Sequence, residues 1–302
     1  MKITHCYVMK RTLFNYIIRE RDLCMFYIDQ VSTNSPEFLE SESRFREFIN
    51  NFTDYSDQRS KLSGKITKRS NKANSYRIAL IRIILHVEKA QNTKIEDLGS
   101  VETFDEINKI RAEKGFQQFN NDKNRFYSAA LSEYERFLKD NLKIIDLEIE
   151  NKINEEILEK ETKNLVVDKS QLVKGQESRK KQVKYKSFYT YPRSINEALY
   201  AKEKADWRCE IQHTHTTFKT KSGKNYVETH HLIPLAYQDD YEMTIDLAAN
   251  LVCLCPSCHR LLHHAIFNQK IEILKKLYEN RKESLRKFGI NVSFDELIEY
   301  YL

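Results

Sequence analysis

The sequence holds two groups of residues that could bind metal ions, both in its last third. Four of its six cysteines and seven of its nine histidines lie between Cys209 and His264. Cys255 and Cys258 are separated by two residues, a spacing that lets two thiolates share one tetrahedral Zn²⁺. Clustered cysteines in a reducing compartment indicate a metal centre before a disulfide. The sequence therefore predicts a structural zinc site here.

Two further zinc ligands must come from elsewhere in the chain. Cys209 is the candidate for the third, and either His213 or His215 could supply the fourth. A redox role for Cys255 and Cys258 would require a thioredoxin-like strand-helix-strand setting, and no such pattern surrounds them. Such a zinc ion would tie together two distant segments of a small module with little core.

The second group consists of histidines on a predicted helix and a predicted strand. His259 and His263 are one helical turn apart, so both can bind one cation. A lone pair with this spacing is more often a surface coincidence, but here His230, His231 and Asn250 precede it. Adjacent strand residues point to opposite faces unless the strand bends, so one of the paired histidines could complete the cation site while the other acts as a general base.

These residues resemble the HNH, or ββα-metal, nucleases, and in particular the bacterial restriction branch that includes the C-terminal module of modified-cytosine restriction enzymes. The matching segments are WRCEIQHTHTTF, YVETHHLIPL and NLVCLCPSCHRLLHH, and the resemblance extends over about Tyr191 to Leu302. It implies a zinc-stapled nuclease fold that uses a second divalent cation, Mg²⁺ or Mn²⁺, and leaves 5′-phosphate and 3′-hydroxyl ends.

The resemblance also implies a role for each matching residue. His231 would be the general base, while His230, His259 and His263 would bind the catalytic cation. Asn250 would orient the base and secure the loop between the two strands. The implied catalytic set is His231, His230, Asn250, His259 and His263, with Glu228 as an acidic support for the site.

One position departs from the family pattern. Many relatives have a second CxxC in the first half of the zinc site, but Gln212 stands where its second cysteine would fall. The resemblance favours His215 over His213 as the replacement ligand, which gives a zinc set of Cys209, His215, Cys255 and Cys258. His264 is a lesser rival to His263, because it lies off the helix face that His259 defines.

The fold class predicted from the whole sequence is mainly α with a small α+β module. Residues 1–145 show helical periodicity, as in 75–89 and 127–138, with two short helices between 95 and 115. A charged linker over 146–190, partly helical at its start, separates this helical domain from a nuclease domain over 191–302. Within the latter we expect a helix capped by Ser194 and ending at Ala205, strands over 226–234 and 250–254, and one helix from Pro256 to about Arg281.

The aromatic residues of the helical domain indicate a packed core. Phe14, Tyr16, Phe45 and Phe48 fall at helical spacing, which favours core positions over base-stacking ones. No motif identifies what this domain does, so recognition of a DNA target and binding of a partner protein both stay open.

The net charge of +6 and the pI of about 8.8 permit a polyanionic partner. Basic runs at 59–82 and 179–186 supply candidate DNA phosphate contacts, although a charge run is usually a solvated face. The candidate DNA-binding residues are Lys68, Arg69, Lys72, Lys180, Lys181 and Lys184. Charged residues such as Arg11 and Arg19 interrupt the apolar runs of residues 1–30, so we expect a soluble, cytoplasmic protein without a membrane partner.

The function that fits these features is hydrolysis of double-stranded DNA in bacterial restriction or another anti-phage defence, with a homodimer or a defence-system protein as a further partner. A homing endonuclease or a nuclease toxin would use the same chemistry, but neither repeated DNA-binding modules nor secretion features are visible. A non-catalytic zinc-binding DNA or protein adaptor is the alternative of another class. It would need the cysteines but not the set of His230, His231, Asn250, His259 and His263.

Overall fold

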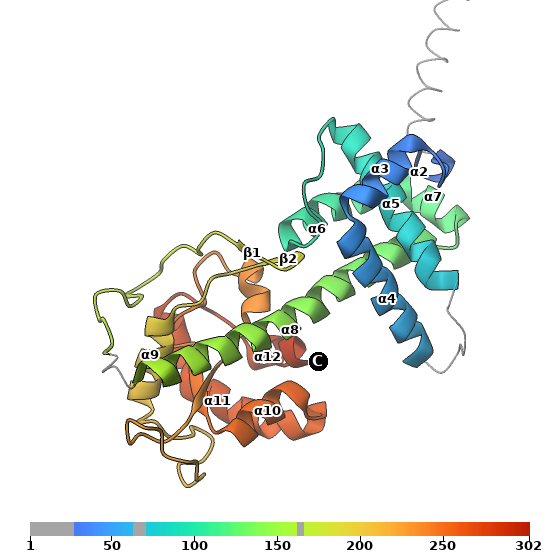
Figure 1. Ribbon diagram of the computed structural model, residues 1–302. Helices are drawn as coiled ribbons and strands as arrows, with labels where there is room; N and C mark the ends of the chain where they lie inside the picture. The colour runs from blue at the N-terminus through green and yellow to red at the C-terminus, as the bar shows by residue number, and fades with distance from the viewer. Residues whose placement is uncertain (1–26, 63–70, 162–165) are drawn as a thin grey trace, which may run out of the picture. The chain divides into compact units, whose positions relative to one another are not determined.

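The computed structural model describes residues 27–62, 71–161 and 166–302 (Figure 1). Cys6, Cys24, Phe14 and Tyr16 and the charged residues that interrupt the first apolar runs lie outside these ranges. Most described residues are helical, and the strands form two small two-stranded sheets. The mainly α prediction is therefore confirmed. The chain divides into two compact units, one up to Lys139 with Lys186–Phe188 and the other comprising Asp140–Tyr185 and Tyr189–Leu302.

Apart from Lys186–Phe188, where β2 (Phe188–Thr190) begins, the described part of the first unit consists of helices and the loops between them. They are α2 (Tyr27–Gln30), α3 (Pro36–Arg44), α4 (Arg46–Leu62), α5 (Asn71–Gln91), α6 (Val101–Asn108), the 3₁₀ turn η1 (Lys109–Ala112), α7 (Phe116–Asp122) and the first part of α8 (Phe126–Glu161). The two short helices expected between 95 and 115 are found as α6 and η1. Gly115, with φ of 88°, adopts the left-handed conformation from which α7 starts.

Aromatic side chains form the core of this unit, as their helical spacing predicts. Phe45 and Phe48 are both buried. The Phe48 ring lies edge-on against Phe137, with centroids 5.2 Å apart, and Phe52 packs against the same ring at 5.6 Å. Edge-to-face packing of this kind stabilises beyond the area that it buries.

The second unit contains the strands predicted around the histidines. Its elements are the rest of α8, β1 (Val183–Tyr185), the end of β2 (Phe188–Thr190), α9 (Ile195–Lys204), β3 (Glu228–His231), the 3₁₀ turn η2 (Leu235–Asp240), β4 (Leu251–Leu254), α10 (Pro256–His264), α11 (Phe267–Lys287) and α12 (Phe294–Tyr301). Ser194 caps α9 by accepting from the Glu197 N–H, as predicted. β3 pairs antiparallel with β4, with His230 opposite Val252, and α10 follows directly. This is a ββα arrangement.

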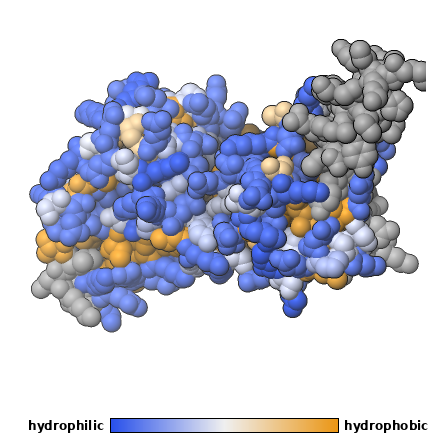
Figure 2. Space-filling model, turned by 90° about the horizontal axis from the view of Figure 1, so that it is seen from above, coloured by the Kyte–Doolittle hydropathy of each residue, from blue (hydrophilic) through white to orange (hydrophobic). Residues whose placement is uncertain are grey.

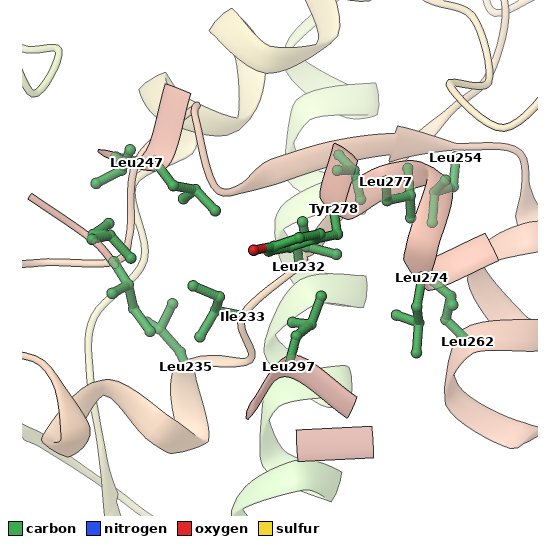
Figure 3. Packing of buried hydrophobic residues seen from close by; sticks show 14 of the residues in the cluster. Leu232, Ile233, Leu235, Leu247, Leu254, Leu262, Leu274, Leu277, Tyr278 and Leu297 are labelled. Atoms are coloured by element: carbon green, nitrogen blue, oxygen red, sulfur yellow. The ribbon is translucent and has the colours of Figure 1, made fainter. Parts of the chain in front are cut away.

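The prediction of a single helix after Pro256 is wrong, because the structure has two helices there. α10 ends at His264, Ala265 and Ile266 are extended with ψ of 160° and 148°, and α11 begins at Phe267. The break allows Leu262 on α10 and Leu274 on α11 to pack into one core. Figure 3 shows these side chains converging with Leu232, Ile233 and Leu277.

The region expected to be a charged linker, 146–190, begins as the second half of α8. Asp146, Glu150 and Asn154 are each less than 5 % exposed, and Ile153 and Ile157 join an apolar cluster with residues of α9 and β4. Few apolar residues suffice here because Asp146, Glu150 and Asn154, which follow one another by a helical turn, bury their polar groups in hydrogen bonds. The helical part of this region is therefore packed within the unit and is not a linker.

The surface is mainly polar. Figure 2 shows one face on which hydrophilic side chains predominate and hydrophobic ones show in a few patches. Within the described ranges, every helix is too short or too polar to cross a lipid bilayer.

Candidate active site

Three cysteines and one histidine meet at the start of α10. The Sγ atoms of Cys209, Cys255 and Cys258 and a ring nitrogen of His215 all lie within 4.8 Å of one another. Nδ1 of His215 is 3.5 Å from Sγ of Cys255 and 3.4 Å from Sγ of Cys258. We call these four residues the thiol cluster.

The donor set and spacing of the thiol cluster fit zinc. Tetrahedral Zn–S and Zn–N bonds place neighbouring sulfur and nitrogen donors about 3.5 Å apart. Burial, followed by the neighbouring Cys209, raises the pKa of Cys258, so thiolates can share this place only beside a positive charge. The structure brings His215 to the cluster and leaves His213 exposed. Cys253 is buried in the apolar core instead.

The second group of histidines gathers around a carboxylate that comes from α8. Oε2 of Glu150 lies 3.1 Å from Nδ1 of His230, 3.2 Å from Nε2 of His259 and 3.3 Å from Nε2 of His263. The nitrogens of His259 and His263 are 3.1 Å apart. We call these four residues the His-Glu cluster.

The His-Glu cluster also has the geometry of a cation site. Donor atoms at adjacent positions around an octahedral cation, each about 2.1 Å from it, lie about 3 Å apart. The four donor atoms come from α8, β3 and α10, and three of the four residues are less than 5 % exposed. His264 is exposed and takes no part.

Two polar groups hold the histidines of this cluster in place. Nδ1 of His259 contacts a carboxylate oxygen of Glu228 at 2.7 Å, which orients the ring with Nε2 toward the cluster. Nε2 of His230 is 2.8 Å from the hydroxyl of Tyr301 on α12, which leaves Nδ1 facing Glu150. Glu228, the acidic residue to which the resemblance gives a supporting role, thus contacts a histidine of the cluster.

His231 lies beside the cluster and is only 3 % exposed. Its Nδ1 is 3.1 Å from Oε1 of Glu150, and its Nε2 is 3.1 Å from a carboxylate oxygen of Asp246. Both paired histidines therefore reach Glu150, because β3 ends at His231 and the chain turns there. The bend at this strand end is the exception to the rule that adjacent strand residues point to opposite faces, and the two rings contact different oxygens of Glu150.

Burial and charge shift the pKa values of these groups in opposite directions. Burial lowers the pKa of His230 to about 4. Burial also lowers that of His231, but the hydrogen bonds to Asp246 and Glu150 outweigh it and raise the pKa to about 9. His259 is likewise raised to about 9 by Glu150 and Glu228 against the effect of burial. The pKa of Glu150 stays well below its usual range despite burial, because His230 and the other histidines surround it.

Asn250 fixes the loop that joins β3 to β4. Its side-chain oxygen accepts from the Ile233 N–H at 2.8 Å, and its amide donates to the carbonyls of Ile233 and Ile245, both at 2.9 Å. Leu232, the neighbour of His231, donates to the Asn250 carbonyl. The side chain of Asn250 thus bonds to Ile233 and Ile245, and its backbone carbonyl bonds to the residue that follows His231.

The basic residues singled out in the sequence have mixed surroundings. Lys68 and Arg69 lie outside the described residues. Lys72 is exposed, with its ammonium 5.3 Å from the Tyr76 ring centroid. Lys181 and Lys184 are exposed, and Lys180 lies 3.7 Å from Asp246. Elsewhere in the first run, Arg59, Lys61 and Arg77 form ion pairs with carboxylates, so that run is less positive than its sequence implied.

The sequence reasoning missed three residues of this site, Glu150, Asn154 and Asp246. Asn154 accepts from the Thr229 N–H at 2.9 Å and donates to the Thr229 carbonyl, while Glu150 accepts from the His231 N–H at 2.9 Å. α8 thereby satisfies the edge of β3 that faces away from β4. The sequence did hold a signal for these α8 residues. Lys143, Asp146, Glu150 and Asn154 follow one another at intervals of three or four residues, which places their polar side chains on one face of a helix.

Comparison with known proteins agrees with this geometry. Residues 209–267 match the family model described as HNH endonuclease. Over 72 residues the chain is 39% identical to the type IV methyl-directed restriction enzyme EcoKMcrA of Escherichia coli, a match that covers 24% of this chain and 24% of that protein. The chain thus spans about a quarter of the relative's length. Residues 209–267, which carry the thiol cluster and the histidines of the second cluster, form a domain of the HNH endonuclease family.

Proposed function

We propose that this protein is a divalent-cation-dependent endonuclease that hydrolyses phosphodiester bonds of double-stranded DNA. The observation that carries the proposal is the convergence of Glu150 and three histidines of the HNH domain on one point beside His231. The printed name of the relative supports restriction, or another anti-phage defence, as the biological setting, and methylated DNA as a substrate to test. The free buried thiols fit a reducing cytoplasm.

The two clusters take different ions in this proposal. The thiol cluster binds structural Zn²⁺, since it offers four protein ligands and no open position. The His-Glu cluster offers three imidazole nitrogens and one carboxylate oxygen. Imidazole suits transition metals, whereas Mg²⁺ prefers oxygen ligands, so this donor set favours Mn²⁺ over Mg²⁺. When bound, the cation would reduce the negative charge on the scissile phosphate and the departing 3′ oxygen.

His231 is the general base in this proposal. Asp246 orients the ring through Nε2, and Nδ1 is the nitrogen on the side of the His-Glu cluster. If Glu150 turned to a cation, His231 would lose one of the two carboxylate contacts that raise its pKa to about 9, and Nδ1 could then give up its proton. A water molecule that replaces the Glu150 contact there gives its proton to Nδ1 and attacks phosphorus. The bond from phosphorus to the 3′ oxygen breaks, and that oxygen takes a proton from solvent, which leaves 5′-phosphate and 3′-hydroxyl ends.

The remaining roles are proposed more broadly. The exposed Lys181 and Lys184, with Lys180, would contact DNA phosphates near the cut, and Lys68, Arg69 and Lys72 would do so from the N-terminal region. The helical residues before α8 would recognise the DNA target or bind a partner, such as a second copy that cuts the other strand.

The test is cleavage of plasmid and phage DNA, methylated and unmethylated, by native protein and by His231→Ala. We expect Mn²⁺-dependent cutting that falls by at least about 10²-fold in His231→Ala. His264→Ala is the matched control, because His264 is exposed and outside the cluster. Zinc content and circular dichroism show that each variant is folded.

Two other outcomes would change the proposal. Equal cleavage by native protein and His231→Ala would remove His231 from the role of base. DNA binding without cleavage of any of these substrates, with or without Mn²⁺, would favour the non-catalytic adaptor.

A further inference from the structure

The segment that leads into β3 folds into a hairpin. The backbone N–H of Tyr226 donates to the Phe218 carbonyl at 2.9 Å, and that of Thr220 donates to the Lys224 carbonyl at 2.8 Å. These hydrogen bonds hold two short arms side by side in antiparallel pairing. We call residues 218–226 the hairpin. It belongs to the HNH domain but supplies no ligand to either cluster.

Phe218 stands out among the residues of the hairpin. Its side chain is 60 % exposed, whereas the other phenylalanines that the structure describes are buried or half-buried. The ring stacks on that of Tyr226, with centroids 4.7 Å apart and planes 13° apart. Stacking covers one face of the Phe218 ring and fixes its direction, so the other face is presented to solvent. A single exposed apolar side chain is common on protein surfaces, so its neighbours decide what it means.

The neighbours of this ring in the sequence are basic, and no carboxylate accompanies them. Lys219, Lys221 and Lys224 lie in the hairpin, and residues 211–227 contain no Asp or Glu. Lys219 and Lys221 are exposed and form no ion pair within the described part of the chain. The ammonium of Lys224 lies 4.0 Å from the centroid of the Trp207 ring. The hairpin therefore carries positive charge next to an exposed aromatic face.

The Tyr226 ring also connects the hairpin to the His-Glu cluster. Its hydroxyl donates to one oxygen of Glu228 at 2.9 Å, and the other Glu228 oxygen contacts Nδ1 of His259 at 2.7 Å. Tyr226 and Glu228 thus stand between the exposed Phe218 ring and a proposed cation ligand. A molecule bound to the hairpin therefore lies near the proposed site of cleavage without entering it.

We propose that the hairpin is a DNA-binding element, in which Lys219 and Lys221 contact backbone phosphates and the free face of Phe218 contacts a base or deoxyribose. The nucleotides it contacts flank the scissile one. The inference rests on the proposed endonuclease function and names a surface that holds the duplex beside the cut. DNA fits this surface because it presents phosphates at regular spacing together with flat apolar groups that an aromatic ring can cover.

The first comparison tests the lysines. The affinity of zinc-loaded protein for a duplex is measured against salt concentration without a second divalent cation, so that binding is followed without cleavage. We expect Lys219→Ala/Lys221→Ala to reduce the slope of log affinity against log salt by about two, equally for all DNA sequences. Lys174→Ala/Lys287→Ala is the matched control, because both lysines are exposed and line a cavity beside α9 and α11 instead. An equal loss of slope in the control would reduce the effect to net charge and overturn the proposal.

The second comparison tests Phe218. An apolar contact releases no counterions, so Phe218→Ala should lower the affinity without changing the slope. We expect a decrease of roughly 5- to 100-fold, the range for loss of an aromatic contact with a base. Phe218→Tyr keeps the ring and should restore most of the affinity. Native affinity in Phe218→Ala would overturn the proposal, and so would a native slope in the double lysine variant.

Mn²⁺ affinity, measured by electron paramagnetic resonance, separates DNA binding from support of the cation site. It should be equal in native protein and in the hairpin variants, since all of them retain Tyr226 and Glu228. Weaker Mn²⁺ binding in Phe218→Ala would assign the ring a role in positioning Tyr226 and overturn the proposal. If native protein bound DNA with the hairpin-dependent slope but cut none, the hairpin would stand as a binding surface and the endonuclease function would fail.

Discussion

The carboxylate of Glu150 accepts a hydrogen bond from the backbone N–H of His231 at 2.9 Å, although 81 residues separate them in the chain. The same oxygen meets Nδ1 of His231, and the other oxygen faces the three remaining histidines. One buried side chain of α8 therefore joins the proposed base to the proposed cation site. The ββα motif of this protein is completed by a helix that precedes it, outside the residues that match the family model.

Glu150→Gln should weaken cation binding while keeping the fold. The amide has the same shape and can still accept from the His231 N–H, but it lacks the negative charge that a divalent cation needs. We expect Mn²⁺ affinity to fall at least tenfold, in titrations followed by electron paramagnetic resonance. Glu155→Gln, an exposed change on the same helix, should bind Mn²⁺ as native protein does. Equal affinity in the two variants would exclude Glu150 as a ligand.

Asn154→Ala should destabilise the protein without touching either cluster. Asn154 is 1 % exposed and bonds both backbone groups of Thr229, so its loss strands a buried N–H and a buried carbonyl. We expect the free energy of unfolding to fall by about 1–3 kcal/mol in urea titrations of zinc-loaded protein. Asn151→Ala, an exposed change on the same helix, should cost far less. Equal midpoints for both variants would show that α8 does not hold β3.

His215→Ala should lose zinc, and His213→Ala should keep it. Of the two histidines, only His215 reaches the thiol cluster. A tetrahedral site left with three protein ligands binds zinc more weakly than one with four. We expect native protein and His213→Ala to hold about one zinc per chain by mass spectrometry of the metal, and His215→Ala to lose it to a mild chelator. Unfolding temperature should fall along with the zinc. Zinc loss in His213→Ala alone would reverse the assignment.

The stability of zinc-loaded protein without a second divalent cation should fall as pH rises above neutrality. The pKa values of His231 and His259 are about 9 in the folded protein and near 6.5 when unfolded. A raised folded pKa contributes stability that is complete below pH 6.5 and is lost as pH rises toward 9, at about 1.4 kcal/mol per pKa unit. Thermal unfolding at pH 6.5, 7.5 and 9 measures this loss.

Asp246→Asn separates the part of that loss that belongs to His231. Asparagine can still accept from the Ser194 N–H, which Asp246 bonds at 2.7 Å, but it removes the charge that raises the pKa of His231. The decline between pH 6.5 and 9 should therefore become shallower in this variant. A decline as steep as that of native protein would mean that Asp246 does not control the protonation of His231.

Part of the site followed from local sequence. The spacing of Cys255 and Cys258, and of His259 and His263, places each pair on one side of a short segment, because a helical turn fixes which residues are neighbours. Local sequence also predicted the strand, strand, helix order, the cap at Ser194 and the aromatic core of Phe45 and Phe48. It showed the basic run around Arg59 as well, but not the carboxylates that pair with it in the fold.

Tertiary structure decided the rest. Glu150 reaches His230 across 80 residues and Asp246 reaches His231 across a loop, and no periodicity relates such positions. His213 and His215 are the same residue type two positions apart, so residue type and spacing left both open as zinc ligands. The path of the chain after Cys209 brings His215 to the thiol cluster. Residues 146–161 are too polar to suggest burial, yet Asp146, Glu150 and Asn154 are buried, and Glu150 and Asn154 bond to β3. Sequence determined which residue types could do this chemistry, and packing between distant segments determined which of them meet.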